Sequence, residues 1–471
     1  MIAPPHRRLL ASAALLAVAI GTVSAGPADP DSAPRFVARW GGHTKDLGYA
    51  VAAGAASVFV TGATWSADFP VSTGRPPSGK AWCAFLTQLQ RSNGALVRSS
   101  VLCGPGMTYG RAAAADGTGA VWVGGSSDGP GLPVSRDAAQ PRYGGGSSTG
   151  GGDAFIARWN PGGELDHLTY LGGAGDETVW GVASDGAGGV WAAGSTTSRP
   201  LFSSSDSLSG AMAAADGFIV HIGADRRLDA VKILGGNGVD ELYDVAPIDP
   251  QRLVVVGATA STDGALGAPR GALDGFMALL DPTTLEVSWT LRLGSAGVDA
   301  LRAVTIVGRR TIVAVGHTDG NACRPRLGGT DGWVVIVSLT GALVRSACVG
   351  TPATDALTDV AATPDGTVWV TGTTHAAALH RPGGREAYHR AFTARLDARG
   401  AAGPLRLVSD EISRGYGIAA DAGGNVYAVG ETTAVPSSTG PWTAALHSTA
   451  GAVRGNHPPG STDPYLVALR P

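Results

Sequence analysis

Carboxylates recur at two fixed places along this sequence, and their number raises the question of cation binding. Five aspartates stand two residues before a recurring aromatic side chain: Asp153, Asp216, Asp274, Asp331 and Asp463. Five further acids stand five residues before the centre of a recurring apolar strand: Asp46, Glu177, Asp240, Asp299 and Asp355. Clustered carboxylate oxygens suit Ca²⁺ or a cationic ligand. An Asp beside a turn also accepts hydrogen bonds from backbone N–H groups, and because these acids recur with the repeat, we favour that structural role.

Patterns associated with nucleophilic and metal catalysis occur in unsuitable contexts. The G-x-S-x-G pattern appears at Gly125–Gly129 and Gly146–Gly150, but neither lies between a strand and a helix, and a chain with 71 Gly produces such matches by chance. His375, His380 and His389 share one loop, with a spacing that matches no known metal site. We therefore predict no catalytic residue, metal ligand or cofactor, with Ca²⁺ as the open alternative.

The tryptophans fall into two groups according to their surroundings. Three lie in the middle of apolar strands and are expected to fill the core: Trp122, Trp191 and Trp369. Three lie at the margins of loops, where a flat apolar ring could pack on a sugar: Trp65, Trp82 and Trp442. The second group, together with the five acids that precede the apolar strands, forms our set of candidate ligand-binding residues.

An internal repeat supplies the elements that must position these side chains. An apolar strand ending in Gly, any residue, then Thr or Ser occurs seven times: Gly62–Thr64, Gly125–Ser127, Gly194–Thr196, Gly257–Thr259, Gly316–Thr318, Gly372–Thr374 and Gly430–Thr432. A following strand carries an aromatic at a fixed position, also seven times: Phe85, Phe155, Phe218, Phe276, Trp333, Phe392 and Tyr465. Each unit contains two more short strands, and Gly-rich turns join the four into an antiparallel sheet.

Seven such sheets predict an all-β, seven-bladed β-propeller of four-stranded antiparallel blades. A single small sheet cannot bury both faces, whereas radial packing covers them and protects most edges. The last unit lacks its outer strand, and the unpaired N-terminal strand Phe36–Gly42 can supply it beside Tyr465–Arg470. We therefore expect the C-terminal blade to be closed by the N-terminal strand.

The repeat resembles the bacterial SBBP-type β-propeller repeat. The motif is carried by Leu171–Glu177, Gly181–Asp185 and Gly189–Thr196, and part of it recurs at Asp421–Tyr427. The Ser-x-Asp-Phe-Pro ending of that family appears once, at Ser66–Pro70. The resemblance covers nearly the whole chain after residue 35 and is weakest from Asp240 to Thr318, where the Asp-x-x-Gly turn is absent. It implies an exported bacterial propeller and no particular reaction.

The N-terminus has the composition of a cleaved export signal. Arg7 and Arg8 precede an apolar run from Leu9 to Ile20, and small residues follow at Val23–Ala25. The run is shorter than the roughly 20 residues that span a bilayer, and no Cys suggests lipid attachment. We expect residues 1–25 to be the signal, 26–35 a short linker and 36–471 the propeller, in a secreted or periplasmic protein without membrane insertion.

Four cysteines in an oxidising compartment are expected to pair. Cys83 opens the third strand of the first unit and Cys103 closes its fourth, while Cys323 and Cys348 are expected on one face of the fifth unit. We predict the disulfides Cys83–Cys103 and Cys323–Cys348, both structural.

The net charge excludes one class of partner but does not identify the ligand. The net charge is −3 and would become −5 on loss of Arg7 and Arg8, which gives no attraction to nucleic acid. Long connections such as Asp128–Gly152 and Thr433–Thr462 are expected on one face of the ring, the long-loop face. We expect a monomeric binding or scaffold module at the cell exterior that contacts an extracellular protein or glycan through this face or through the central channel. The alternatives are a glycosidase or lyase that uses channel carboxylates, and a multivalent lectin.

Overall fold

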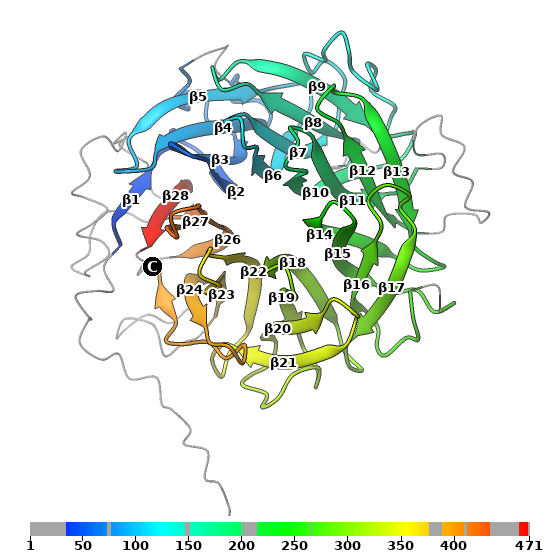
Figure 1. Ribbon diagram of the computed structural model, residues 1–471. Helices are drawn as coiled ribbons and strands as arrows, with labels where there is room; N and C mark the ends of the chain where they lie inside the picture. The colour runs from blue at the N-terminus through cyan, green and yellow to red at the C-terminus, as the bar shows by residue number, and fades with distance from the viewer. Residues whose placement is uncertain are drawn as a thin grey trace, which may run out of the picture.

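Seven four-stranded antiparallel sheets form a closed ring around a central axis (Figure 1). The computed structural model describes residues 34–72, 77–146, 151–198, 201, 214–264, 266–375, 389–408, 412–433 and 461–469. Blades 1 to 6 take their strands in sequence order: β2–β5, β6–β9, β10–β13, β14–β17, β18–β21 and β22–β25. Blade 7 combines β26, β27 and β28 with β1 as its outer strand. The predicted seven-bladed propeller is confirmed.

In every blade the four strands follow one another from the central axis outward. The innermost strands are β2 (Asp46–Ala53), β6 (Thr108–Ala115), β10 (Glu177–Ser184), β14 (Asp240–Asp249), β18 (Asp299–Val307), β22 (Asp355–Ala362) and β26 (Ser413–Ala420). The second strands are β3 (Ser57–Thr64), β7 (Val121–Ser127), β11 (Val190–Thr196), β15 (Arg252–Thr259), β19 (Thr311–Thr318), β23 (Val368–Thr374) and β27 (Val426–Thr432). They carry the Gly-x-Thr repeat.

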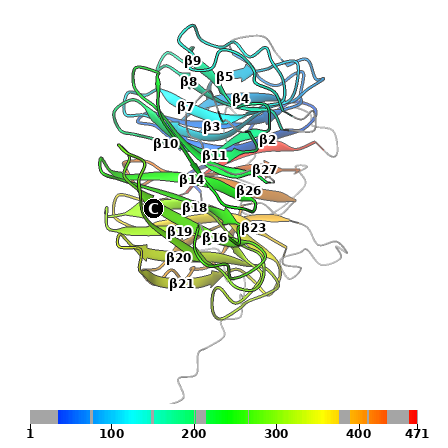
Figure 2. The same ribbon diagram turned by 90° about the vertical axis from the view of Figure 1, so that its right-hand side faces the viewer.

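The outer half of each blade follows the same order. The third strands are β4 (Cys83–Gln90), β8 (Asp153–Trp159), β12 (Asp216–Ile222), β16 (Asp274–Leu280), β20 (Asp331–Ser338), β24 (Arg390–Leu396) and β28 (Asp463–Leu469). The outer strands are β5 (Leu96–Leu102), β9 (Leu165–Leu171), β13 (Leu228–Leu234), β17 (Val287–Leu293), β21 (Leu343–Val349), β25 (Arg406–Leu407) and β1 (Phe36–Arg39). The side view in Figure 2 shows the strands running between the two faces of the ring.

The core lies between neighbouring blades. Second and third strands such as β7 and β16 are buried along their whole length, because adjacent blades cover both of their faces. Trp122, Trp191 and Trp369 each pack in a cluster that includes side chains of the next blade. Their predicted core role is confirmed. The described residues contain no helix long and apolar enough to cross a membrane.

The N-terminal strand closes the ring. β1 pairs antiparallel with β28, and Phe36 lies opposite Ala468 while Arg39 lies opposite Tyr465. This confirms the predicted closure, although β1 ends at Arg39 rather than Gly42. The chain leaves the ladder there because the N–H of Gly42 donates to Asp46 at 2.7 Å, which directs it into β2.

Both predicted disulfides are confirmed. Cys83 bonds to Cys103 and Cys323 to Cys348, with Cα–Cα distances of 4.6 and 5.2 Å. Each joins segments of one blade. The four cysteines therefore fasten blades 1 and 5 internally and do not connect blades.

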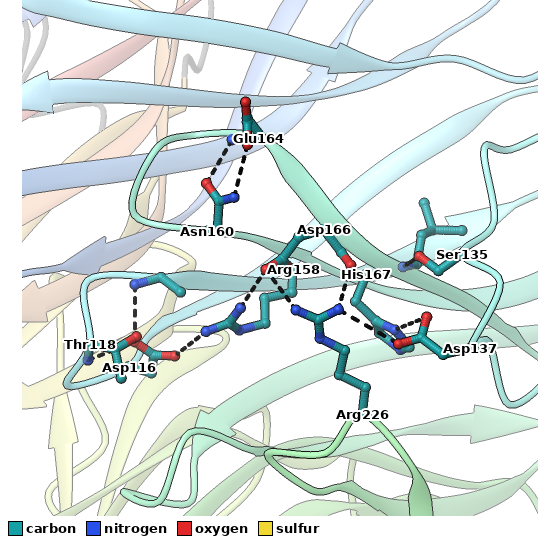
Figure 3. Close-up of polar contacts among 12 residues, drawn as sticks. Asp116, Thr118, Ser135, Asp137, Arg158, Asn160, Glu164, Asp166, His167 and Arg226 are labelled. Atoms are coloured by element: carbon teal, nitrogen blue, oxygen red, sulfur yellow. Dashed lines mark hydrogen bonds and ion pairs between the residues drawn. The ribbon is translucent and has the colours of Figure 1, made fainter.

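An ion-pair network joins blades 2 and 3 (Figure 3). Arg226, in the turn between β12 and β13, donates to Asp166 Oδ2 at 3.0 Å and lies 3.6 Å from Asp137. Arg158 of β8 donates to the same Asp166 oxygen at 2.7 Å and lies 3.3 Å from the buried Asp116. Arg226 is the member from blade 3, so its contacts bind the two blades together at this seam.

Truncation of Phe36 should destabilise the ring at its closure. Phe36 is buried and packs in the cluster that holds Phe85 of blade 1 and Tyr427 of blade 7. Phe36→Ala should lower the free energy of unfolding by about 3 kcal/mol, because it leaves a cavity at this seam. Urea denaturation measures the change. Val97→Ala, at an exposed valine of β5, should change it by less than about 0.5 kcal/mol. Equal effects of the two substitutions would contradict the role of Phe36 in closure.

Candidate functional site

The acids that begin the innermost strands hold the chain where one blade passes into the next. Each carboxylate accepts the N–H of the residue four positions earlier: Gly42 for Asp46, Gly173 for Glu177, Gly236 for Asp240, Ser295 for Asp299 and Thr351 for Asp355. All five acids are buried. These hydrogen bonds are those of a structural strut, so the acids do not face an open surface.

The Thr of the Gly-x-Thr repeat belongs to the same polar layer. Thr196 lies opposite Glu177 on one side and Asp216 on the other, and its hydroxyl donates to Glu177 at 2.7 Å. Third-strand aspartates hold the adjoining loops in a similar way. Asp274 accepts the N–H of Arg270 at 2.8 Å, and Asp331 accepts that of Leu327 at 3.1 Å. The repeated acids therefore fix both kinds of connection on one face of the ring, which we call the long-loop face.

A β-bulge occurs at the same place in all seven innermost strands. In each blade, one residue of the innermost strand has no partner in the second strand, and this residue stands three positions after the first residue of the innermost strand. A bulge redirects the side chain of the extra residue. The skipped residues, which we call the bulge ring, are Tyr49, Arg111, Trp180, Tyr243, Arg302, Thr358 and Tyr416.

The bulge ring lines two cavities along the central axis. The upper cavity, of about 440 Å³, adds His317, Ala356 and Leu357 to the ring and lies toward the long-loop face, where the innermost strands begin. The lower cavity, of about 410 Å³, adds residues that follow the bulges, including Asp244 and Asp359. The ring therefore separates two compartments whose volumes are in the range of small-molecule sites.

Arg111 lies among three aromatic rings. Its guanidinium carbon is 4.6 Å from the ring centroids of Tyr49 and Tyr109 and 5.4 Å from that of Trp180. Its Nε is buried and makes no hydrogen bond. Within the described part of the chain, no carboxylate lies within 4 Å of this guanidinium. The rings stabilise the charge by cation–π contact without neutralising it.

Arg302 contributes a second positive charge to the ring. Its guanidinium carbon lies 4.0 Å from the centroid of Tyr243, and among described residues it too has no ion-pair partner. Burial and the positive charge of Arg302 lower the pKa of the nearby His317 to about 4, so this imidazole is neutral at pH 7. Arg111 and Arg302 stand on blades 2 and 5, on different sides of the axis.

Two carboxyl groups lie on the lower side of the ring. Asp244 accepts N–H groups from Val245 and from Val304 of the next blade, at 2.8 and 2.9 Å. Asp359 makes the equivalent bonds to Val360 and to Ile418 of the next blade, both at 2.7 Å. Burial raises the pKa of Asp244 to about 7; burial and the charge of Asp244 raise the pKa of Asp359 to about 8. Both side chains connect neighbouring innermost strands.

The loop-margin tryptophans lead toward this site. Trp65 and Trp82 are partly exposed, and their ring centroids lie 5.5 Å apart. Trp82 lies 6.0 Å from Tyr109, which in turn contacts Arg111. The structure thus brings two predicted ligand residues into one row of rings with the bulge ring, while Trp442 lies outside the described residues. Their part in ligand binding stays a prediction.

The described residues contain one close group of three potential metal ligands. The group of three potential ligands that lie close together, Cys323, Asp331 and Cys348, includes both sulfurs of a disulfide, which leaves no thiolate. The ten repeated carboxylates would be the oxygen donors for Ca²⁺, but the five at the innermost strands already accept backbone N–H groups. The calcium alternative stays untested.

Comparison with known proteins gives a likeness in fold. No family model and no curated protein match the chain. The β-propeller domain of the Trilobed protease from Pyrococcus furiosus has 7% identity and a TM-score of 0.42 over 85% of this chain and 91% of that one. Sqt1 from Chaetomium thermophilum has 11% identity and a TM-score of 0.43 over 93% and 99%. The Dos1 propeller has 8% identity and a TM-score of 0.43 over 85% and 94%. These values bear on neither ligand nor activity.

The bulge ring was not predicted from the sequence. Its signal was present, because each member stands three residues after the residue that begins the innermost strand, as Tyr49 follows Asp46. The residue at that position differs from blade to blade: it is aromatic in four blades, Arg in two and Thr in one. A position that packed against the same neighbouring side chains in every blade would keep one residue type. Variation at this position therefore indicates that its side chain is not part of the core between blades.

The two lower carboxyl groups should make stability depend on pH. Their raised pKa values mean that the folded chain binds these protons more tightly than the unfolded chain, whose value is 3.8. The free energy of unfolding should therefore fall as pH rises toward about 8. The Asp244→Asn/Asp359→Asn variant should lose roughly half or more of the decrease between about pH 6 and pH 8.5, measured by urea denaturation.

An exposed aspartate serves as the control for this pH effect. Asp225 is largely exposed in the turn between β12 and β13. Asp225→Asn should leave the pH dependence unchanged. A double variant with the same pH dependence as the parent protein would contradict the assignment to Asp244 and Asp359.

Proposed function

We propose that the protein is an exported binding module whose ligand enters the central channel from the long-loop face and rests on the bulge ring. The observation that supports this most directly is the upper cavity, where two arginines without acidic partners stand among four aromatic rings. Uncompensated charge inside a protein costs stability, and a ligand that supplies the missing partner recovers it.

Export is the second part of the proposal. It is supported by Arg7 and Arg8 ahead of the apolar run Leu9–Ile20, by the resemblance to the exported SBBP-type repeat, and by two disulfides. Disulfides persist in oxidising compartments. A binding module at the cell exterior accounts for these features together.

A carbohydrate-active enzyme is the second candidate, because Asp244 and Asp359 are channel carboxyl groups with raised pKa values. Glycosidases need one carboxyl as acid and another as base or nucleophile, both directed at the substrate. Here each carboxylate accepts hydrogen bonds from two backbone N–H groups, one of them from the next blade. That arrangement ties the carboxylates to the scaffold, so binding is the better supported function.

The export part is tested with a reporter that is active only outside the cytoplasm. Residues 1–35 fused to bacterial alkaline phosphatase should give phosphatase activity in a Gram-negative host, because the signal carries the enzyme to an oxidising compartment. Arg7→Glu/Arg8→Glu should reduce that activity by reversing the charge ahead of the apolar run. Activity no higher than that of phosphatase without the leader would contradict export.

The binding part is tested by placing a larger side chain in the bulge ring. Thr358 is its smallest member, and Thr358→Trp should block the channel and abolish binding of any probe that uses it. Maltohexaose, a galacturonate hexamer and hexa-alanine are tested by isothermal titration calorimetry. Thr290→Trp, on the exposed side of β17, is the matched control and should bind as the parent does. Unchanged binding by Thr358→Trp, or conversion of a probe to products, would contradict a channel-binding module.

A further inference from the structure

We infer that the upper cavity binds the carboxylate-bearing sugar rings of an acidic oligosaccharide. This inference rests on the proposed function and names its ligand class. The side chains that line the upper cavity include two arginines and no Asp or Glu. His317 is neutral at pH 7, so Arg111 and Arg302 are the charged side chains among the residues that line this cavity.

Arg111 keeps hydrogen-bond donors for a carboxylate. Its guanidinium carbon lies 4.6 Å from the ring centroids of both Tyr49 and Tyr109, and its Nε is buried. The terminal nitrogens of Arg111 are therefore the donors that a ligand in the upper cavity can reach, and they form no ion pair with any described residue. Arginine binds a planar carboxylate with two parallel hydrogen bonds.

Aromatic side chains supply the second element of recognition. Tyr49 contacts Tyr416 edge to face, with centroids 5.3 Å apart, and Trp180 contacts Tyr243 similarly at 6.3 Å. These rings give the cavity an apolar wall against which the C–H face of a sugar can pack. The indole N–H of Trp180 donates to Ser195 at 3.0 Å, which fixes the orientation of that ring.

The row of rings beyond the cavity favours a chain of sugars over a single small anion. Tyr109, Trp82 and Trp65 continue from Arg111 to the loop margin of blade 1. A small anion such as sulfate would contact only the guanidinium. An oligosaccharide would extend along the row, and its hydroxyl groups would face the water of the channel mouth.

The bulge ring separates the guanidiniums of the upper cavity from two carboxyl groups below it. The carboxyl groups of Asp244 and Asp359 line the lower cavity, on the other side of the bulge ring. An anion that enters from the long-loop face therefore reaches the two guanidiniums before it reaches Asp244 and Asp359. Glu241 and Glu431, on the same side of the ring as the upper cavity, accept hydrogen bonds from Tyr243 and Tyr416, and Glu431 also pairs with Arg414. A ligand with an ammonium group, such as a free peptide, is disfavoured in the upper cavity by the two guanidiniums.

The test compares one sugar chain with and without its charge. Isothermal titration calorimetry of the mature protein at pH 7 is carried out with a galacturonate hexamer, an alginate hexamer and the fully methyl-esterified galacturonate hexamer. We expect an acidic hexamer to bind at least about tenfold more tightly than the ester, since a charged hydrogen-bond pair is lost on esterification. Arg111→Gln and Arg302→Gln should each weaken binding of the acid by about tenfold or more and leave the ester unaffected.

Matched controls separate recognition from folding and from general electrostatics. Arg227→Gln removes an equal charge from an exposed side chain and should change the affinity by less than about twofold. Arg111→Lys keeps the charge but loses the planar donor pair, so it should also weaken binding if Arg111→Gln fails to fold. Trp180→Phe should reduce the change in tryptophan fluorescence that accompanies binding.

Three results would overturn the inference. They are equal affinity for acid and ester, displacement of the acidic hexamer by sulfate at equal concentration, and no binding of either acidic hexamer. If maltohexaose or hexa-alanine binds through the channel in the same experiments, the proposed function holds and the acidic-sugar inference alone fails. If Thr358→Trp leaves every affinity unchanged, the channel itself is not the site, and both proposals fail.

Discussion

Closure of the ring is the constraint on which the other features of this protein depend. A four-stranded blade has two apolar faces, and each is covered only when a neighbour stands on both sides. Sequence order provides six complete blades and three strands of a seventh, so β1 must return to β28. Phe36 then completes the cluster between blades 7 and 1. The central channel exists because this pairing brings the seven innermost strands into one circle.

Within the closed ring, one short repeat element performs two tasks. Its first residue is commonly an acid whose carboxylate binds the backbone four residues earlier, which fixes where the innermost strand begins. Three residues later, the bulge sends a side chain toward the axis. The structural part of the element is nearly uniform from blade to blade, whereas the bulge residue varies. The residue that holds the scaffold and the residue that lines the channel are thus three positions apart in the sequence.

The channel also shows how a propeller can hold charge near its axis. Arg111 and Arg302 are accommodated by aromatic faces, which attract a guanidinium without pairing its donors. On the lower side, Asp244 and Asp359 are held by N–H groups of their own and the next blade. Arg111 and Arg302 therefore lie on one axis with Asp244 and Asp359 without forming ion pairs with them. This separation gives the two cavities different electrostatic character.

Turns and the alternation of apolar side chains depend on residues close together in the chain, so the blade count, the four-stranded sheets, the closing strand and both disulfides could be predicted from the sequence. It also favoured the structural role of the repeated acids and the core position of Trp122, Trp191 and Trp369. The fixed position of the bulge residues, three after the start of each innermost strand, is also present in the sequence. That Tyr49, Arg111 and Arg302 face one axis could not be predicted, because they come from blades far apart in the chain and a bulge changes the period of a strand by one residue. Whether an arginine has an acidic partner depends on which side chains of other blades lie beside it, and that arrangement arises only when the ring closes.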